Sequence, residues 1–372
     1  MTGPLRIAAH NGARAYGGGE KWTVLLLKGL AERGHQVHLF CNDEGVAARA
    51  AAHGVPASQG ALGGHLMLPH VWTFSRRLRG FRPDVLLLST FKKVWLGGMA
   101  ARLAGVPRVV SRIGLDTDLP GKHWTYRLAF RRWVDAVLVN ADGIRRDIVD
   151  GLPGYPAGRV ATVYDGIRLP GPVPDRAEAR TALGLPAEGH VVGSVTRLSP
   201  QKRLDRFLDV MALLPGVQAV LAGEGESEGA LRARAAELGL VERVHFLGYR
   251  EDVGTVLAAL DVFLLTSDAE GMANAMLEAM AAGVPVVSTP VSGADEALAP
   301  DAEGRAPGLV TSAVPSALAD AARGVLELPA VRLSMGLEGR RRVEARFSFD
   351  AMLDAWEAVL AGASPTAWHR GR

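Results

Sequence analysis

The sequence predicts an α/β protein of two doubly wound domains, each a parallel sheet with helices on both faces. At 372 residues the chain exceeds one ordinary hydrophobic core, because domains typically hold about 100–200 residues. Short apolar runs alternate with longer stretches of helical period, and this series occurs twice. A segment rich in proline and glycine, residues 163–175, separates the two series.

Each expected strand is a short, largely apolar run bounded by turn residues. In the first half these runs are residues 5–10, 36–41, 84–90, 108–114 and 135–140. In the second half they are residues 190–195, 217–223, 243–248, 261–267 and 284–289. Stretches of helical period lie between them, for example from Glu20 to Arg33 and from Gln201 to Leu214. Parallel strands joined by crossover helices produce this alternation.

The proline-rich segment sets the expected domain boundary. We place the first domain at residues 1–168 and the second at residues 169–347, with a cleft between them. The tail, about 348–372, is expected to contain an amphipathic helix that rejoins the first domain. Its apolar residues recur at spacings of three to four, as Phe349, Met352, Trp356 and Leu360.

Composition excludes several classes of protein. Apolar residues make up 48% and charged residues 22%, which is globular rather than disordered. The first apolar run is too short for a signal peptide or a membrane span, so we expect a cytoplasmic protein. Cys41 is the sole cysteine, which excludes a disulfide framework and a cysteine-based zinc site. The zinc-protease, esterase and P-loop motifs are all missing.

Charge is distributed unevenly along the chain, although the net charge is only +3. Residues 1–165 hold 22 Lys and Arg against 12 Asp and Glu, whereas the remainder holds 20 against 27. A basic first half predicts an anionic partner, such as a membrane surface, an acidic acceptor or a phosphate, and we expect no nucleic-acid partner. Solvated helix faces with no partner would give the same asymmetry.

The most informative pattern lies in residues 261–289, which read as a strand, a short loop, a helix and another strand. We expect the helix from about Met272 to Ala282, because Gly283 and Pro285 end it. The first backbone N–H groups of a helix are free to bind sugar hydroxyls or phosphate oxygens. Here they belong to Gly271, Met272, Ala273 and Asn274.

Glu270 and Glu278 lie about two turns apart at this helix, near one end of the expected cleft. A paired-carboxylate hydrolase would use them as acid and nucleophile across one bond. A transferase would instead use each carboxylate to accept hydrogen bonds from donor hydroxyls. A third interpretation leaves Glu278 as an ordinary solvent-facing helix residue.

Arg197 and Lys202 follow the first strand of the second series, beside a helix expected to start near Pro200. Two cations next to a helix N-terminus form a site for a diphosphate leaving group. Ligands bind at the carboxyl ends of such strands, which favours a functional role over surface ion pairing. In the first series, the loop Gly17, Gly18, Gly19 and Glu20 would likewise let the backbone approach an anion.

These residues resemble glycosyltransferase family 4. The string E-G-x-x-N-x-x-x-E-A-x-A-x-G-x-P-V, from Glu270 to Val286, is similar to the family signature. Arg197 and Lys202 fall where the family keeps its phosphate-binding Arg and Lys, and the glycine loop resembles the family's N-terminal one. The segment V-Y-D-G-I is similar to the family's V-x-N-G-I, with Asp165 in place of the usual Asn.

The resemblance spans nearly the whole chain and implies a GT-B fold, two facing Rossmann-like domains. It implies a metal-independent, retaining transferase with no cofactor, in which the donor phosphate takes the acceptor proton. The acceptor, bound by the first domain, would be lipid-linked, a polysaccharide or a small molecule. Arg197, Lys202 and Glu270 would be catalytic, Glu270 holding the sugar hydroxyls, Glu278 the ribose, and Tyr249 and Arg250 the base. The donor-binding set is Gly18, Gly19, Gly223, Tyr249, Arg250, Gly271, Met272, Ala273, Asn274 and Glu278.

One position departs from the family pattern. Many members carry a His after a strand of the first domain, near the transferred sugar, and Arg112 occupies the approximate place here. Arg112, Asp116, Asp118 and His123 are therefore the candidate acceptor residues. The D-x-D string formed by Asp116 and Asp118 would hold a divalent metal in the other glycosyltransferase architecture, but such short strings are common by chance.

Two further functions remain open: a sugar-nucleotide epimerase or hydrolase of similar fold, and a non-catalytic sugar-nucleotide-binding subunit. Arg197, Lys202, Glu270 and Glu278 are all present, which disfavours the second. The stretch 66–84 interleaves apolar residues with four arginines, as an interfacial helix does at anionic headgroups. We therefore expect peripheral contact with the inner face of a membrane. A core helix with a solvated basic face would show the same pattern.

Overall fold

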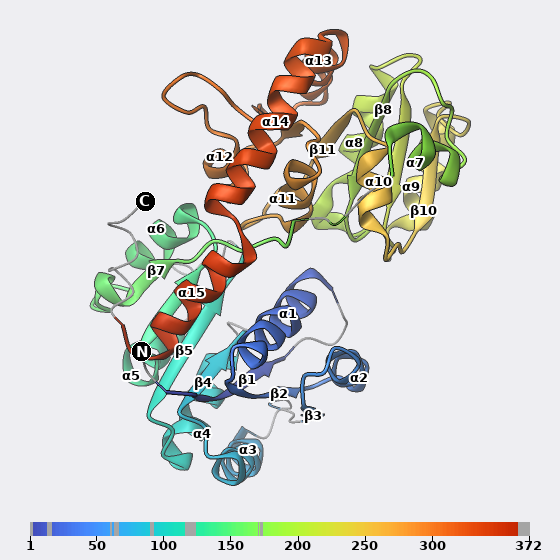
Figure 1. Ribbon diagram of the computed structural model, residues 1–372. Helices are drawn as coiled ribbons and strands as arrows, with labels where there is room; N and C mark the ends of the chain where they lie inside the picture. Colours follow the sequence, from blue (N-terminus) through green and yellow to red (C-terminus); the bar gives the residue numbers. More distant parts are fainter. Residues whose placement is uncertain are drawn as a thin grey trace. The chain divides into compact units, whose positions relative to one another are not determined.

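The computed structural model describes residues 3–12, 17–59, 62, 67–89, 93–115, 124–169, 171 and 174–363 (Figure 1). The chain divides into two compact units, the first being Met1–Tyr164 with Asp350–Arg372 and the second Asp165–Phe349. Each contains one parallel sheet, so the predicted α/β class is confirmed. Of the helices in the described ranges, none is long and apolar enough to cross a membrane.

The first unit is built on a seven-stranded sheet with the order β3-β2-β1-β4-β5-β6-β7, and all its pairings are parallel. The strands are β1 (Arg6–Asn11), β2 (Gln36–Cys41), β3 (Ala57–Gln59), β4 (Val85–Leu88), β5 (Arg108–Ile113), β6 (Ala136–Val139) and β7 (Val160–Thr162). The helices are α1 (Gly18–Glu32), α2 (Glu44–Ala52), α3 (Met67–Phe81), α4 (Val94–Ala104), α5 (Trp124–Trp133), α6 (Asp142–Gly151) and α15 (Phe349–Leu360), and a 3-10 turn, η2, spans Ala157–Arg159. Successive strands are added toward one edge of the sheet from β1 to β3 and toward the other edge from β4 onward. Ligands of such folds bind at this switch point, between β1 and β4.

The second unit repeats this plan with a six-stranded parallel sheet in the order β10-β9-β8-β11-β12-β13. The strands are β8 (Val191–Val195), β9 (Gln218–Ala222), β10 (Val244–Gly248), β11 (Val262–Leu265), β12 (Val286–Ser288) and β13 (Gly308–Val310). The helices are α7 (Arg176–Ala182), α8 (Leu204–Ala212), α9 (Glu228–Glu237), α10 (Val253–Ala258), α11 (Asn274–Ala281), α12 (Ser292–Leu298), α13 (Pro315–Glu327) and α14 (Pro329–Arg346), with a 3-10 turn η3 (Pro200–Lys202) before α8. The switch point here lies between β8 and β11.

The C-terminal helix α15 packs on α1 within the first unit. The Trp356 and Trp22 rings, both buried, have centroids 5.4 Å apart. Arg33, at the end of α1, forms ion pairs of 2.7 Å with Asp354 and 2.8 Å with Glu357. The partly buried ion pairs and the buried aromatic contact together attach α15 to α1.

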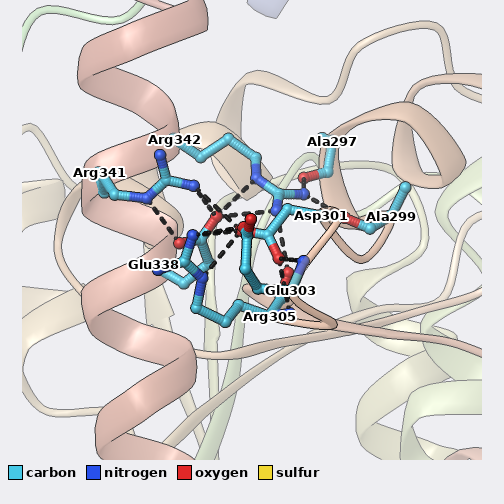
Figure 2. A network of polar contacts seen from close by, with 8 residues as sticks. All are labelled: Ala297, Ala299, Asp301, Glu303, Arg305, Glu338, Arg341 and Arg342. Atoms are coloured by element: carbon cyan, nitrogen blue, oxygen red, sulfur yellow. Dashed lines mark hydrogen bonds and ion pairs between the residues drawn. The ribbon is translucent and has the colours of Figure 1, made fainter.

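Helix α14 holds α12 through a charged network (Figure 2). The buried Arg342 guanidinium bonds Glu338 Oε1 at 2.8 Å and donates to the carbonyls of Ala297 at 3.1 Å and Arg305 at 3.2 Å. It also donates to the Ala299 carbonyl, so the open end of α12 has a hydrogen-bond partner. The hydrogen bond from Arg341, helped by Arg342, holds the pKa of Glu338 below its ordinary value. The network fixes where α12 ends.

Two predicted helices are wrong in their bounds. The helix expected from Gln201 to Leu214 is interrupted at Arg203, which has the left-handed φ of 49° and separates η3 from α8. The helix expected from Met272 to Ala282 begins at Asn274 and ends at Ala281. Ala273 is extended, with ψ of 109°, so residues 270–273 form a loop.

Candidate functional site

The candidate site lies where β8 and β11 end, at neighbouring positions in the second sheet. These strands pair in parallel, with Gly193 opposite Phe263, so the loops that follow them leave the same edge. The β8 loop carries Arg197 and Lys202, and the β11 loop carries Glu270. Residues that are 68 positions apart in the chain are therefore neighbours.

A third loop joins this edge after β9, at Gly223. Its φ is 140°, and a Cβ there would lie 1.9 Å from the carbonyl oxygen of Thr196. No side chain fits at that distance, so glycine is required for the close approach. Its N–H donates to the Gly248 carbonyl at 2.7 Å, which brings the loop after β10 to the same edge.

Lys202 and Glu270 form an ion pair at the centre of the site. The Lys202 ammonium donates to Oε1 of Glu270, and the Ser267 hydroxyl donates to the same oxygen at 2.8 Å. The two charged side chains are only 22% and 8% exposed, respectively. The Thr289 hydroxyl donates to the Ser267 carbonyl at 2.7 Å, which fixes the turn that holds Ser267. Both charged groups are consequently preorganised.

Direct contacts between the two loops set the position of this pair. The Asp268 N–H donates to the Gln201 carbonyl at 3.1 Å, and the Gln201 amide returns a bond of 2.7 Å to the Ala269 carbonyl. The Thr266 hydroxyl donates to the Lys202 carbonyl at 3.0 Å. Backbone and side chain thus join the segment of Lys202 to the segment of Glu270.

Two arginines of the α8 segment complete this connection by binding Asp268. Arg206 donates 2.8 Å to Asp268 Oδ1 and 2.6 Å to the Thr266 carbonyl. Arg203, whose left-handed backbone directs it here, lies 3.0 Å from Asp268 and 2.9 Å from Asp205. Burial opposes ionisation of Asp268, but the hydrogen bonds from Arg206 and Arg203 outweigh it and lower the pKa of Asp268. We call Arg203, Arg206 and Asp268 the loop clamp.

Arg197 differs from Lys202 in its contacts. It is exposed, and within the described ranges its guanidinium forms no hydrogen bond or ion pair. Its place beside the Lys202 loop makes it available to a ligand anion, and the bidentate guanidinium matches phosphate geometry.

The β11 loop and the start of α11 provide acceptors for hydroxyl groups. Asn274 Oδ1 is buried and has no hydrogen-bond partner in the described part of the chain, and such a group requires one. Gly293 N–H donates to the Gly271 carbonyl at 3.0 Å, and a Cβ on Gly293 would lie 2.3 Å from that oxygen. Helix α12 therefore packs against the β11 loop through Gly293. In the sequence, the only sign of this contact is that Gly293 follows an expected strand.

The other donor-binding candidates of the second unit lie on two elements. Met272 and Ala273 are buried in the β11 loop, and Glu278 is half-buried on α11, one turn after Asn274. Tyr249 is 54% exposed after β10, while Arg250 pairs with Asp252 at 2.6 Å. Glu224, which the sequence did not single out, accepts the Tyr249 N–H at 3.4 Å.

In the first unit, Glu20 caps α1. Its carboxylate accepts the Gly17 N–H at 3.0 Å and the Asn11 amide at 3.5 Å. Among the described residues, no heavy atom lies within 4 Å of a Cβ placed on Gly18 or Gly19.

Of the four candidate acceptor residues, the structure describes only Arg112. The Arg112 guanidinium lies 3.6 Å from the centroid of the Trp22 ring, a cation–π contact. Asp116, Asp118 and His123 lie outside the described residues. Among the residues that the structure describes, no group of three or more His, Cys, Asp and Glu side chains could hold a metal ion.

Comparisons with known proteins identify relatives for both units. A family model described as glycosyltransferase family 4 matches residues 16–169, and one described as glycosyl transferases group 1 matches residues 175–342. The lipopolysaccharide core biosynthesis glycosyltransferase LpsE of Rhizobium meliloti is 29% identical over 93% of this chain and 96% of its own. A D-inositol 3-phosphate glycosyltransferase of Mycobacterium marinum is 38% identical over 43% of this chain and 36% of its own.

Solved structures share the fold. The crystal structure of Anabaena HepE in complex with UDP and glucose superposes with a TM-score of 0.83. The match covers 96% of this chain and 99% of HepE at 23% identity.

Proposed function

We propose that this chain, which belongs to glycosyltransferase family 4 and has the GT-B fold, transfers a sugar from a nucleotide-sugar donor with retention of anomeric configuration. The observation that carries the proposal is the meeting of Arg197, Lys202 and Glu270 at one sheet edge. Two cations and one preorganised carboxylate suit a ligand with a diphosphate at one end and hydroxyl groups at the other. The second unit is then the donor domain, and the first binds the acceptor.

Each residue of this edge binds a different part of the donor. Arg197 binds the diphosphate, and Lys202 bridges from Glu270 to the phosphate as negative charge develops there. Glu270 and the unpaired Asn274 oxygen accept hydrogen bonds from the sugar hydroxyls. Glu278 accepts from the ribose, and Tyr249 with Arg250 borders the base.

Retention follows if the acceptor attacks on the face from which the diphosphate leaves. The departing phosphate then takes the acceptor proton, so the mechanism requires no side-chain base. Two cations, of which Lys202 is held by Glu270, stabilise the charge that grows on the leaving group, a role that a metal ion fulfils in other transferases. We therefore propose activity without a divalent metal.

Calorimetry with a panel of nucleotide sugars tests the donor assignment. UDP-glucose comes first, because HepE was solved with UDP and glucose. We expect one donor to bind with a micromolar to millimolar Kd and to bind less tightly to the Arg197→Ala variant. If no nucleotide sugar binds, or if the variant binds each one equally well, the donor site lies elsewhere.

The loop clamp is expected to act on turnover more than on stability. Asp268→Asn weakens the hold on Arg203 and Arg206, so the distance between Lys202 and Glu270 is no longer fixed. We expect kcat to fall about tenfold or more, because a misplacement of about 1 Å at a reacting group slows an enzyme strongly. The melting temperature changes less, because Asp268 is half exposed and the buried Arg206 keeps its hydrogen bond to the Thr266 carbonyl. Initial rates and thermal melts measure both quantities.

Asp205→Asn is the matched control, because it removes the second Arg203 partner and leaves Asp268 in place. Equal losses of kcat in the two variants would contradict a specific role for the clamp. Since the pKa of Asp268 is lowered in the folded protein, its stabilising contribution is present at neutral pH. That contribution disappears only as the pH falls below the ordinary range of an aspartate.

We also propose a lipid-linked or anionic acceptor, reached by peripheral binding at the membrane surface. On α3, Val71, Phe74 and Leu78 pack in the core, whereas Leu68 is 71% and Trp72 57% exposed. The Arg76 guanidinium lies 4.9 Å from the Trp72 ring centroid. Exposed Trp and Leu beside arginines on one helix suit an interface with anionic headgroups.

Vesicle co-sedimentation at low salt tests this surface. Vesicles with anionic lipid should bind the chain and neutral ones should not, and binding should fade as salt shortens the Debye length. Reversing three arginines of α3 to Glu should abolish binding: Arg76, Arg77 and Arg79. The control reverses three exposed arginines elsewhere: Arg146, Arg232 and Arg323. Equal binding to both kinds of vesicle, or no effect of the α3 reversal, would remove the proposal.

A further inference from the structure

A second cationic site lies on the donor domain, in a groove between α14, the end of α11 and the start of α7. Its volume is about 380 Å³. Ten residues line it, among them Arg176, Arg332, Arg340, Leu333 and Leu337. Three of these are arginines and none is acidic. We call it the arginine groove.

The positive charge in the groove exceeds what the protein neutralises. Asp261 is 2% exposed and is already paired with the buried Arg180 at 2.8 Å. Arg176 at 2.9 Å and Arg332 at 3.7 Å share that same carboxylate. Three guanidinium groups around one carboxylate leave an excess positive charge, and the Arg176 side chain is 49% exposed, so it can reach a ligand.

Arg340 adds a third cation to the groove. Its Nε donates to the Ala281 carbonyl at 3.3 Å, at the last turn of α11, and within the described ranges it has no acidic partner. The N-terminus of α11 faces the β11 loop, whereas the groove lies beyond its C-terminus. Eight helical residues separate the two ends by roughly 12 Å, so the groove is distinct from the donor site.

The groove also presents an apolar wall. Leu333 is 66% and Leu337 62% exposed, one turn apart on α14, and Pro285 and Pro329 lie beside them. A ligand that carries an anion on a small carbon skeleton would contact both the arginines and this wall. The volume is within the range of small-molecule sites, about 300–1,000 Å³, and is too small for a protein domain.

We propose that the arginine groove binds a small soluble phosphate ester, with the phosphoryl group on Arg176, Arg332 and Arg340 and the carbon skeleton against Leu333 and Leu337. Guanidinium groups hold phosphate through paired N–H bonds in fixed geometry. The groove is therefore a binding site in addition to the donor site, and it does not depend on the donor chemistry.

Calorimetry with glycerol 3-phosphate tests the site in the full chain. The background is the Arg197→Ala/Lys202→Ala variant, so that the donor site does not compete for phosphate. We expect saturable binding there, and a loss of at least tenfold in affinity when Arg340→Gln is added. Leu337→Glu places a carboxylate beside the arginines at an exposed position, and it should abolish binding while thermal melts stay unchanged.

The control variant Arg323→Gln removes a cation from an exposed helix position outside the groove and should bind as the background does. Equal weakening by Arg323→Gln and Arg340→Gln would reduce the effect to general charge and overturn the site. With Arg76, Arg77 and Arg79 of α3 also changed to Glu, binding to phosphatidylglycerol vesicles that Arg340→Gln removes, without binding to glycerol 3-phosphate, would assign the groove to a lipid surface and overturn it as well. So would the absence of any phosphate binding in the background variant.

Discussion

Arg197→Ala and Lys202→Ala are each expected to lower kcat by roughly 10²–10³, or about 2.7–4 kcal/mol, because each removes a charged donor from the departing diphosphate. The Kd and KM of the donor should rise by a smaller factor, since the contact already exists in the ground state and strengthens as charge develops. Steady-state kinetics with the donor found by calorimetry measures both constants.

Arg197→Ala is the cleaner of the two variants. Its guanidinium has no partner in the described part of the chain, so its removal breaks no protein contact. Lys202→Ala also removes a partner of Glu270, which among the described residues keeps the Ser267 hydroxyl at 2.8 Å. Normal turnover in the Arg197 variant would refute the assignment of the phosphate site.

Glu270→Gln and Glu278→Gln should have different kinetic effects. The first removes the negative charge that orients Lys202 and weakens the hydrogen bonds to the sugar, so kcat/KM should fall about 10²-fold. The second weakens only a contact to the ribose, made equally in ground and transition states, so the donor KM should rise about tenfold while kcat stays.

The same pair of variants distinguishes transfer from hydrolysis through a glutamate nucleophile. In the paired-carboxylate mechanism a glycosyl group becomes covalently attached to one Glu. Mass spectrometry of protein quenched during turnover should find no such adduct on Glu270 or Glu278. An adduct on either residue would replace the proposed mechanism.

Local sequence pattern predicted ten of the thirteen described strands; it missed the short strands β3, β7 and β13. Parallel strands are continuous apolar runs, and cations or carboxylates at their carboxyl ends mark the ligand edge. Arg197, Lys202 and Glu270 follow this rule, and the structure joins Lys202 to Glu270 directly.

What the sequence did not predict depends on contacts between distant residues. Helical period continues through Arg203, but ion pairs with Asp205 and Asp268 accompany a left-handed backbone there. The arginine groove combines positions from 176 to 340, and no window of sequence contains them together. The contact of Gly293 with Gly271 likewise exists only once α12 and the β11 loop are packed.

The stereochemistry of the transferred sugar tests the central claim most directly. The chain is incubated with a ¹³C-labelled nucleotide sugar, an acceptor extract and chelator, and the anomeric carbon of the product is followed by NMR. The account predicts a new glycosidic bond with the anomeric configuration of the donor, formed without divalent metal and formed roughly 10²–10³ times more slowly by the Arg197→Ala variant. Inverted configuration, an epimerised sugar nucleotide, or free sugar as the sole product would contradict it.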